Sequence, residues 1–224
     1  MSDLGDAHLQ NRLDDLHDQS RQQEELITAY FKDRGDSVNW ANLDDHAHQF
    51  LADKLVALDP DKAMFCHRLC IAMRAKRVIE VGTSNGVSTL YLAQAMKRLE
   101  SADGERGLVI TTEYEASKAA TARANFAAAG LADYIELREG DLRQTLREIQ
   151  DPIDFVLMDI WEMARPAIEL ITPHLRRGAI VIADNTSDFG ESYEAYFDYV
   201  RNPASAFTTQ TLPFAGGLEM TVKL

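Results

Sequence analysis

From residue 77 onwards, short apolar runs alternate with longer amphipathic stretches along the chain. Runs rich in β-branched residues predict strands at residues 77–81, 108–112, 134–137, 153–158 and 179–183. The stretches between and after them have helical spacing and predict helices at residues 87–99, 116–129, 142–149, 166–175 and 193–200. Strict alternation of strand and helix is typical of a parallel sheet that is covered on both faces.

Two further strands are expected near the end of the chain, at residues 206–212 and 218–223. Gly216 and Gly217 between them predict a tight turn, so this pair should be antiparallel. The predicted fold class is therefore α/β, a Rossmann-like sheet of seven mostly parallel strands with helices on both faces.

The first 58 residues are polar and helical in pattern, and we expect an N-terminal helical cap on a single domain of residues 59–224. Residues 35–37 predict a break in the cap, and Asp59 with Pro60 predicts the start of a helix that runs to about Arg74. An apolar stripe in the cap predicts core packing or a subunit contact, which makes a homodimer one interpretation. Its members are Leu9, Leu13, Leu16, Leu26, Ile27, Tyr30 and Phe31.

Composition and charge narrow the classes of function. The chain has 224 residues, 46% of them hydrophobic, and a formal net charge of −13. Such a surface repels phosphate, so neither nucleic acid nor an anionic membrane is an expected partner. The start has no signal-peptide pattern and no apolar run reaches a membrane span of about 18 residues, so a cytoplasmic protein is expected. Cys66 and Cys70 are expected to be reduced, buried residues of a helix.

The first predicted strand is followed by a glycine loop, Gly82-Thr83-Ser84-Asn85-Gly86. In open α/β sheets, ligands bind at the carboxyl ends of the strands, and glycines there let the backbone approach a ligand at a helix N-terminus. A dinucleotide fingerprint needs further glycines at the third and sixth positions, where Ser84 and Val87 stand. The loop therefore disfavours a nicotinamide cofactor, and a plain tight turn is the other interpretation.

Polar residues also end the second and third strands. Glu113 is placed to accept hydrogen bonds from both hydroxyls of a ribose, with a solvated surface residue as the alternative. Asp141 and Leu142 follow the third strand, where an adenine amino group and ring would find an acceptor and an apolar surface. Asp141 is equally suited to cap a helix, and both roles are compatible.

The ends of the fourth and fifth strands carry an all-oxygen cluster of Asp159, Asp184 and Asn185. Adjacent parallel strands bring these ends side by side, and such ligands suit Mg²⁺ or Ca²⁺. Like charges at this distance repel unless a cation lies between them. The alternative is that these residues act as separate caps and turns.

The residues from Glu80 to Gly86, then Glu113, then Asp159-Ile160-Trp161, then Ala183-Asp184-Asn185 resemble class I S-adenosylmethionine-dependent methyltransferases. The nearest resemblance is to the catechol O-methyltransferase-like O-methyltransferases, from about Asp59 to the end of the chain. It implies a cofactor site made of Glu80, Gly82, Thr83, Ser84, Gly86, Ser88, Glu113, Asp141, Leu142, Asp159 and Trp161. It also implies that Asp159, Asp184 and Asn185 hold Mg²⁺, which would lower the pKa of a substrate hydroxyl.

One departure from the resembled family concerns the general base. A lysine follows the Asp-x-Trp segment in catechol-type enzymes, whereas this chain has Glu162. Three interpretations stay open: Glu162 is itself the base, His46 or His48 from the cap supplies that role, or the metal site is altered or lost.

The resemblance implies an O-methyltransferase, assisted by a divalent metal, that acts on a hydroxyl of a small molecule, with phenols as one candidate class. A metal-independent O- or N-methyltransferase is the first alternative, and a protein that binds S-adenosylmethionine without turnover is the second. The identity of the methyl acceptor cannot be read from the sequence.

Overall fold

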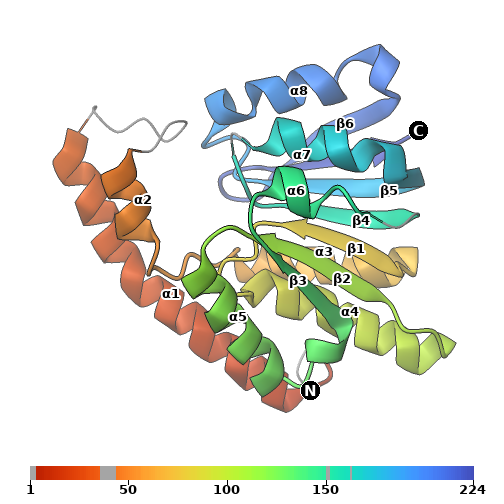
Figure 1. Ribbon diagram of the computed structural model, residues 1–224, viewed down its shortest axis with the longest axis horizontal. Helices are drawn as coiled ribbons and strands as arrows, with labels where there is room; N and C mark the ends of the chain where they lie inside the picture. The colour runs from red at the N-terminus through yellow and green to blue at the C-terminus, as the bar shows by residue number, and fades with distance from the viewer. Residues whose placement is uncertain (1–3, 36–43, 150–151, 162) are drawn as a thin grey trace.

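The computed structural model describes residues 4–35, 44–149, 152–161 and 163–224. Its centre is a seven-stranded sheet with the order β3-β2-β1-β4-β5-β7-β6 (Figure 1). The first five strands in this order are parallel to one another, and β7 is antiparallel to both β5 and β6. The strands are β1 (Arg77–Val81), β2 (Leu108–Glu113), β3 (Ile135–Glu139), β4 (Ile153–Met158), β5 (Leu175–Asp184), β6 (Phe207–Leu212) and β7 (Leu218–Lys223). The predicted fold class is confirmed.

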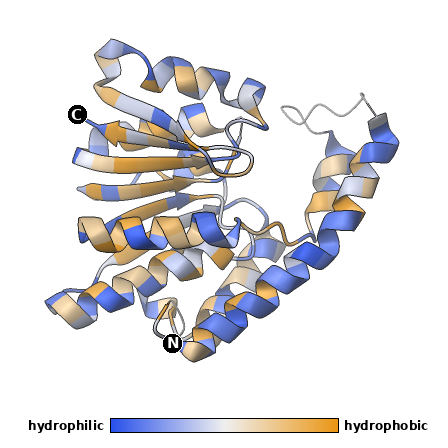
Figure 2. Cartoon of the chain, turned by 180° about the vertical axis from the view of Figure 1, so that it is seen from behind, coloured by the Kyte–Doolittle hydropathy of each residue, from blue (hydrophilic) through white to orange (hydrophobic). Residues whose placement is uncertain are grey.

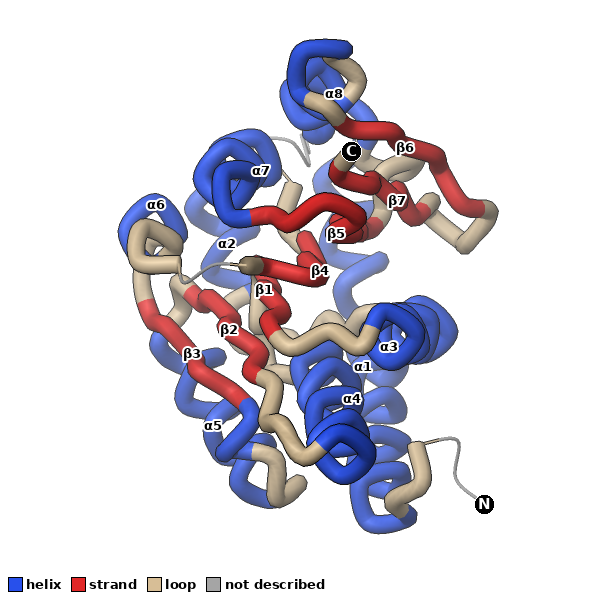
Figure 3. The backbone as a smooth tube through the Cα atoms, turned by 90° about the vertical axis from the view of Figure 1, so that its right-hand side faces the viewer, coloured by secondary structure: helices blue, strands red, loops and turns tan. Residues whose placement is uncertain are grey.

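Helices cover both faces of the sheet, with α3 and α4 on one side and α6 and α7 on the other (Figure 3). The helices are α1 (Ala7–Arg34), α2 (Asp45–Leu51), α3 (Pro60–Met73), α4 (Val87–Asp103), α5 (Ala116–Ala128), α6 (Leu142–Thr145), α7 (Ala164–Ile171) and α8 (Glu194–Val200). Cys66 and Cys70 are buried free thiols in α3, as predicted. Within the described ranges, no helix is long and apolar enough to cross a bilayer.

The central strand β4 shows how the sequence divides the interior into two cores. Phe155 and Leu157 belong to the core under α3 and α4, whereas Val156 and Met158 belong to the core under α7 and α8. Successive side chains of a strand point to opposite faces, so an unbroken apolar run is what a doubly covered strand requires.

Asp154 is the polar exception in β4, and it lies at the end of the strand opposite Asp159. One carboxylate oxygen accepts from the backbone N–H groups of Lys76, at 2.8 Å, and Arg77, at 3.0 Å. The other accepts from the guanidinium of Arg176 at 2.5 Å. These contacts satisfy the buried charge and join the start of β1 to β4 and β5.

Several predicted boundaries were wrong, most clearly the ends of two helices and the start of β5. The helix predicted at residues 142–149 ends at Thr145, and the guanidinium of Arg138 donates to the carbonyls of Thr145 and Glu148 beyond it. The helix predicted to reach residue 175 ends at Ile171, because Pro173 has no N–H group to continue the helical pattern. A 3₁₀ turn follows, and β5 begins earlier than the predicted residue 179.

The N-terminal cap is divided along α1. Leu9, Leu13 and Leu16 are buried in the core that contains α4, as the stripe predicted. Leu26 is 60% exposed, so core packing, one of the two predicted roles of the stripe, does not hold for this residue within the chain. The second half of α1 and α2 project away from the sheet (Figures 1 and 2). Gly35 ends α1, and the remainder of the predicted break, Asp36 and Ser37, lies outside the described residues.

Candidate functional site

The carboxyl ends of four parallel strands bring the predicted site residues into one row. Val81 pairs with Thr112 on one side and with Met158 on the other, and Met158 pairs with Ala183. The next residue of each strand or loop is a predicted site residue, and these are Gly82, Glu113, Asp159 and Asp184. Residues that lie up to 102 positions apart in the sequence therefore meet at one edge of the sheet.

The glycine loop requires glycine at both ends. Gly82 has a φ of 100°, and a Cβ there would lie 2.5 Å from the carbonyl oxygen of Asp159. Gly86 has a φ of 84°, and a Cβ there would overlap the ring of Phe126. Side chains at these positions would push the loop off β4 and α5, so the two glycines make this close approach possible.

The loop leaves hydrogen-bonding groups available for a ligand at the N-terminus of α4. Gly86 is the N-cap residue of this 17-residue helix, and it supplies no capping side chain. The hydroxyl of Ser84 is buried and has no hydrogen-bond partner among the described residues. The first N–H groups of a helix have no partner within it, and together with the unpaired hydroxyl of Ser84 they suit an anionic group such as a carboxylate.

Glu80 lies fully buried below the loop, where three hydroxyl groups donate to its carboxylate. The donors are Ser88 at 2.6 Å, Thr111 at 2.6 Å and Thr89. Burial raises the pKa of Glu80 to about 7, although these hydrogen bonds act in the opposite direction. Glu80 and Ser88 thus fix the first turn of α4 to β1, and the hydroxyl of Thr83 joins the same group through Thr111 at 2.5 Å.

Glu113, the residue predicted to bind a ribose, contacts the glycine loop directly. One carboxylate oxygen accepts from the backbone N–H of Ser84 at 2.7 Å, and the other accepts from that of Glu115 at 2.9 Å. The side chain is half-buried, so it is held in place beside the loop while part of it stays accessible.

At the other end of the row, the structure shows the capping role of Asp141. Its carboxylate accepts from the backbone N–H of Arg143 at 2.8 Å and from the guanidinium of that residue. These contacts lower the pKa of Asp141 to about 2. Leu142 and Trp161 are half-buried and pack against the same core, and the Trp161 ring lies 4.6 Å from that of Phe189.

The acidic cluster contains a cation that the sequence analysis missed. The ammonium of Lys62 lies 2.5 Å from Oδ1 of Asp184 and 3.0 Å from Oδ1 of Asn185. The side chains of Lys62 and Asp184 are both only 4% exposed. Burial raises the pKa of Asp159, as do the charges of Asp184 and Glu80. Burial also raises the pKa of Asp184, and Lys62 opposes that shift.

This arrangement does not fit a divalent cation. Two of the three predicted ligand residues already accept hydrogen bonds from the ammonium of Lys62. A divalent ion between the same oxygens would meet that positive charge at contact distance, which electrostatic repulsion opposes.

Lys62 left a weak signal in the sequence. It is the third residue of α3, after the N-cap Asp59, and a cation in the first helical turn opposes the helix dipole. A nearby anion would offset this unfavourable charge, and Asp184, 122 residues further along the chain, is that anion.

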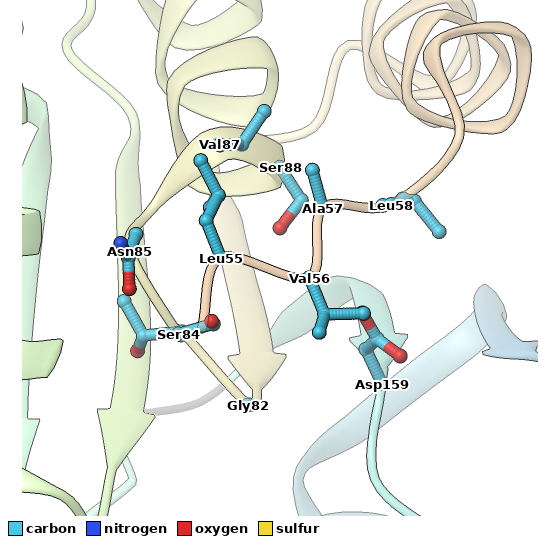
Figure 4. Close-up of a pocket in the computed structure, with 11 residues that line it drawn as sticks. Leu55, Val56, Ala57, Leu58, Gly82, Ser84, Asn85, Val87, Ser88 and Asp159 are labelled. Carbon is cyan, nitrogen blue, oxygen red and sulfur yellow. The ribbon is translucent and has the colours of Figure 1, made fainter. Parts of the chain in front are cut away.

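The cap contributes a segment that the sequence analysis also missed. Residues 55–58 cross the glycine loop, and they line a pocket together with Gly82, Ser84 and Asp159 (Figure 4). Val56 is turned towards Asp159 in this pocket and is 51% exposed. Of the three predicted general bases, only His46 can be placed with its side chain, and it is exposed in α2. The side chain of His48 and the whole of Glu162 lie outside the described part of the chain.

Comparison with known proteins identifies relatives of this arrangement. A family described as "Methyltransferase domain" matches residues 79–186. The catechol O-methyltransferase of Mycobacterium tuberculosis is 34% identical over 132 residues, which are 58% of this chain and 57% of that protein. The catechol O-methyltransferase of Niastella koreensis is 30% identical over 139 residues, which are 58% of each chain. The chain thus spans a little over half the length of these curated relatives.

Solved structures share the fold at lower identity. The O-methyltransferase from Bacillus cereus, in complex with SAH, is 24% identical and has a TM-score of 0.65. The match covers 75% of this chain and 83% of that protein. Sheet order, glycine loop and relatives agree: residues 79–186 match the methyltransferase-domain family, and a little over half of the chain is similar to catechol O-methyltransferases.

Proposed function

We propose that this protein transfers a methyl group from S-adenosylmethionine to a hydroxyl oxygen of a small molecule, with phenols as the first class to test. The observation that carries the proposal is the row of Gly82, Glu113 and Asp159 beside the uncapped N-terminus of α4. Relatives named catechol O-methyltransferases support oxygen as the acceptor atom and a phenol as the acceptor class.

In the proposed complex, the methionine end of the cofactor lies on the glycine loop. The N–H groups at the start of α4 and the hydroxyl of Ser84 would bind its carboxylate. Thr83, whose hydroxyl donates to Thr111, would hold the loop in place. Glu80 and Ser88 would act from below, because their mutual hydrogen bond keeps that first turn in place. The nearby carboxylate of Asp159 favours the positive charge of the sulfonium.

The nucleoside would extend along the row towards β3. Glu113 would accept hydrogen bonds from the two ribose hydroxyls, since each of its oxygens retains a free lone pair. Leu142 and Trp161 would flank the adenine ring. Asp141 keeps its role as the cap of α6 and would accept from the adenine amino group as well.

The proposed reaction is a single displacement at the methyl carbon. The acceptor oxygen forms a bond to the methyl carbon as the bond from that carbon to sulfur breaks, and S-adenosylhomocysteine leaves. The hydroxyl proton passes to a carboxylate, for which Asp159 and Glu162 are the proposed acceptors. Holding oxygen, carbon and sulfur in line supplies much of the rate gain.

The cap is proposed to shape the acceptor site. Residues 55–58 line the pocket that also contains Asp159, so an acceptor that reaches this carboxylate passes Val56 (Figure 4). The proposed boundary between a cap of residues 1–58 and a cofactor domain of residues 59–224 would then lie at the site itself, just before the helix that carries Lys62.

A homodimer is a separate part of the proposal. The second half of α1 projects from the sheet and exposes Leu26, which leaves an apolar position for a second copy. Sedimentation velocity tests this directly, because a dimer of the 25.1 kDa chain sediments well apart from the monomer.

The function is tested by incubating the protein with methyl-labelled S-adenosylmethionine and a panel of catechols, simple phenols and aromatic amines. We expect label in a phenolic ether together with S-adenosylhomocysteine. Label only in the amines would instead indicate an N-methyltransferase. Binding of S-adenosylhomocysteine without any labelled product across the panel would indicate a protein that binds the cofactor without turnover.

A further inference from the structure

A lysine, Lys62, contributes the positive charge at the acidic edge of the site. Its ammonium donates to one oxygen of Asp184 at 2.5 Å and to the amide oxygen of Asn185 at 3.0 Å. Lys62 and Asp184 are both nearly inaccessible to water. A buried carboxylate is stable only with a close partner of opposite charge, and here the chain itself supplies that partner.

Local structure fixes Lys62 from its own side of the site. Asp59 caps α3 by accepting from the backbone N–H of Asp61 at 2.9 Å, and Pro60 occupies the first helical position. Helix α3 packs extensively against α4, the helix that begins at the glycine loop. The ammonium therefore projects from a helix whose start is fixed by its N-cap and whose position is fixed by packing against α4.

The acceptor side of the contact is equally constrained. Asn185 has a φ of 55°, and its carbonyl accepts from the backbone N–H of Phe189 at 3.0 Å. Its amide oxygen faces Gly216, where an added Cβ would come within 2.5 Å of that oxygen. The turn between β6 and β7 thus holds Asn185 towards Lys62, and larger residues at 216 would displace it.

We propose that Lys62 is the resident cation of this site, and that its ammonium takes the place a divalent metal would take between Asp184 and Asn185. The inference rests on the proposed function for its consequence: the acceptor hydroxyl meets an edge of the sheet where the chain itself already balances the charge of Asp184, and methyl transfer needs no added metal. Lys62 balances that charge permanently, whereas a metal would do so only when bound.

The test is a titration with Mn²⁺ followed by electron paramagnetic resonance, which reports bound metal without any turnover. Wild-type protein in metal-free buffer should leave millimolar Mn²⁺ unbound. Lys62→Met should bind Mn²⁺ at least 10-fold more tightly than wild type, because removal of the ammonium frees one oxygen of Asp184 and one of Asn185. Lys76→Met is the matched control, since Lys76 also pairs with a carboxylate, that of Glu105, but at the surface.

A second variant addresses folding. If Lys62→Met is too unstable to titrate, Lys62→Met combined with Asp184→Asn removes both charges of the pair. This double variant should fold and should bind Mn²⁺ no better than wild type. If the double variant also fails to fold, the titration of wild type decides the question. Tight Mn²⁺ binding by wild type would overturn the proposal.

Cofactor binding separates this inference from the proposed function. Wild type should bind S-adenosylhomocysteine in EDTA, and EDTA should change the rate of methyl transfer less than twofold. Activity that EDTA abolishes and Mg²⁺ restores overturns the role of Lys62 while the methyltransferase assignment stands. If wild type binds neither the cofactor nor Mn²⁺, the proposed function is overturned. Lys62 then still stands as the resident cation beside Asp184.

Discussion

The backbone N–H of Ser84 donates a hydrogen bond of 2.7 Å to Oε2 of Glu113. This contact ties the glycine loop after β1 to the end of β2, so the two parts of the proposed cofactor site are positioned by each other. Because the other oxygen of Glu113 is held by Glu115, the carboxylate is already oriented before a ligand arrives. Preorganised groups of this kind lose little entropy on binding.

Replacing Glu113 by Ala should therefore lower the affinity for S-adenosylhomocysteine about 10- to 100-fold, the expected cost of hydrogen bonds to a charged group. Glu113→Gln should fall between wild type and Ala, because it keeps one acceptor oxygen. Calorimetric titration measures both, with Glu105→Ala as a control at an exposed position. Equal affinity of Glu113→Ala and wild type would remove Glu113 from the site.

Gly82→Ala should destabilise the protein and weaken cofactor binding. A side chain there meets the carbonyl oxygen of Asp159 at 2.5 Å and also imposes a positive φ on a non-glycine residue. Gly104→Ala is the control, because it has a similar positive φ with open space around it. The left-handed backbone costs about 1 kcal/mol in both variants, and overpacking should add about 2 kcal/mol in Gly82→Ala alone. Urea denaturation giving equal losses would contradict the close approach.

Glu80→Gln should change how stability depends on pH. Burial raises the pKa of Glu80 from 4.5 to about 7, so between these values the folded protein holds a proton that the unfolded chain has released. The free energy of unfolding of wild type therefore falls as pH rises through this window, by about 3 kcal/mol from this residue. The variant lacks this contribution.

Urea denaturation of both proteins across this pH range measures the effect. As pH rises from 4.5 to about 7, the free energy of unfolding of Glu80→Gln relative to wild type should rise by about 3 kcal/mol and then level off. A constant difference between the two proteins would show that Glu80 titrates normally in the folded state.

Asp154→Ala should reduce stability without affecting the site. Asp154 accepts from two backbone N–H groups and from Arg176 at the end of β4 opposite Asp159, so its loss leaves all three donors without that partner. We expect the free energy of unfolding to drop by about 3 kcal/mol. Affinity for S-adenosylhomocysteine, measured well below the melting temperature, should stay within twofold. A large loss of affinity at full stability would reverse this assignment.

Much of the fold could be read from the sequence because each strand of the parallel sheet is a short apolar run between clear breaks. The bounds of β1, β4 and β7 agree with the predictions at both ends. The errors arose where distant residues decide a boundary. The guanidinium of Arg138 donates to the carbonyls of Thr145 and Glu148 where α6 ends. No local pattern at residues 142–149 indicates that contact.

The site divides in the same way. Strand ends predicted that Gly82, Glu113, Asp159 and Asp184 meet at one edge, because parallel strands in register bring consecutive ends together. Lys62 escaped prediction since its partner lies 122 residues away and joins a helix to a strand. Periodicity reports which face a residue occupies, but it does not report which charge that residue will meet.

The central claim is that the strand ends around the glycine loop bind one S-adenosyl nucleoside. Calorimetric titration of wild-type protein with S-adenosylhomocysteine in EDTA tests this most directly. We expect saturable binding of one nucleoside per chain, and we expect added Mg²⁺ to change the affinity less than twofold. No detectable heat and no shift in melting temperature, with or without Mg²⁺, would contradict it.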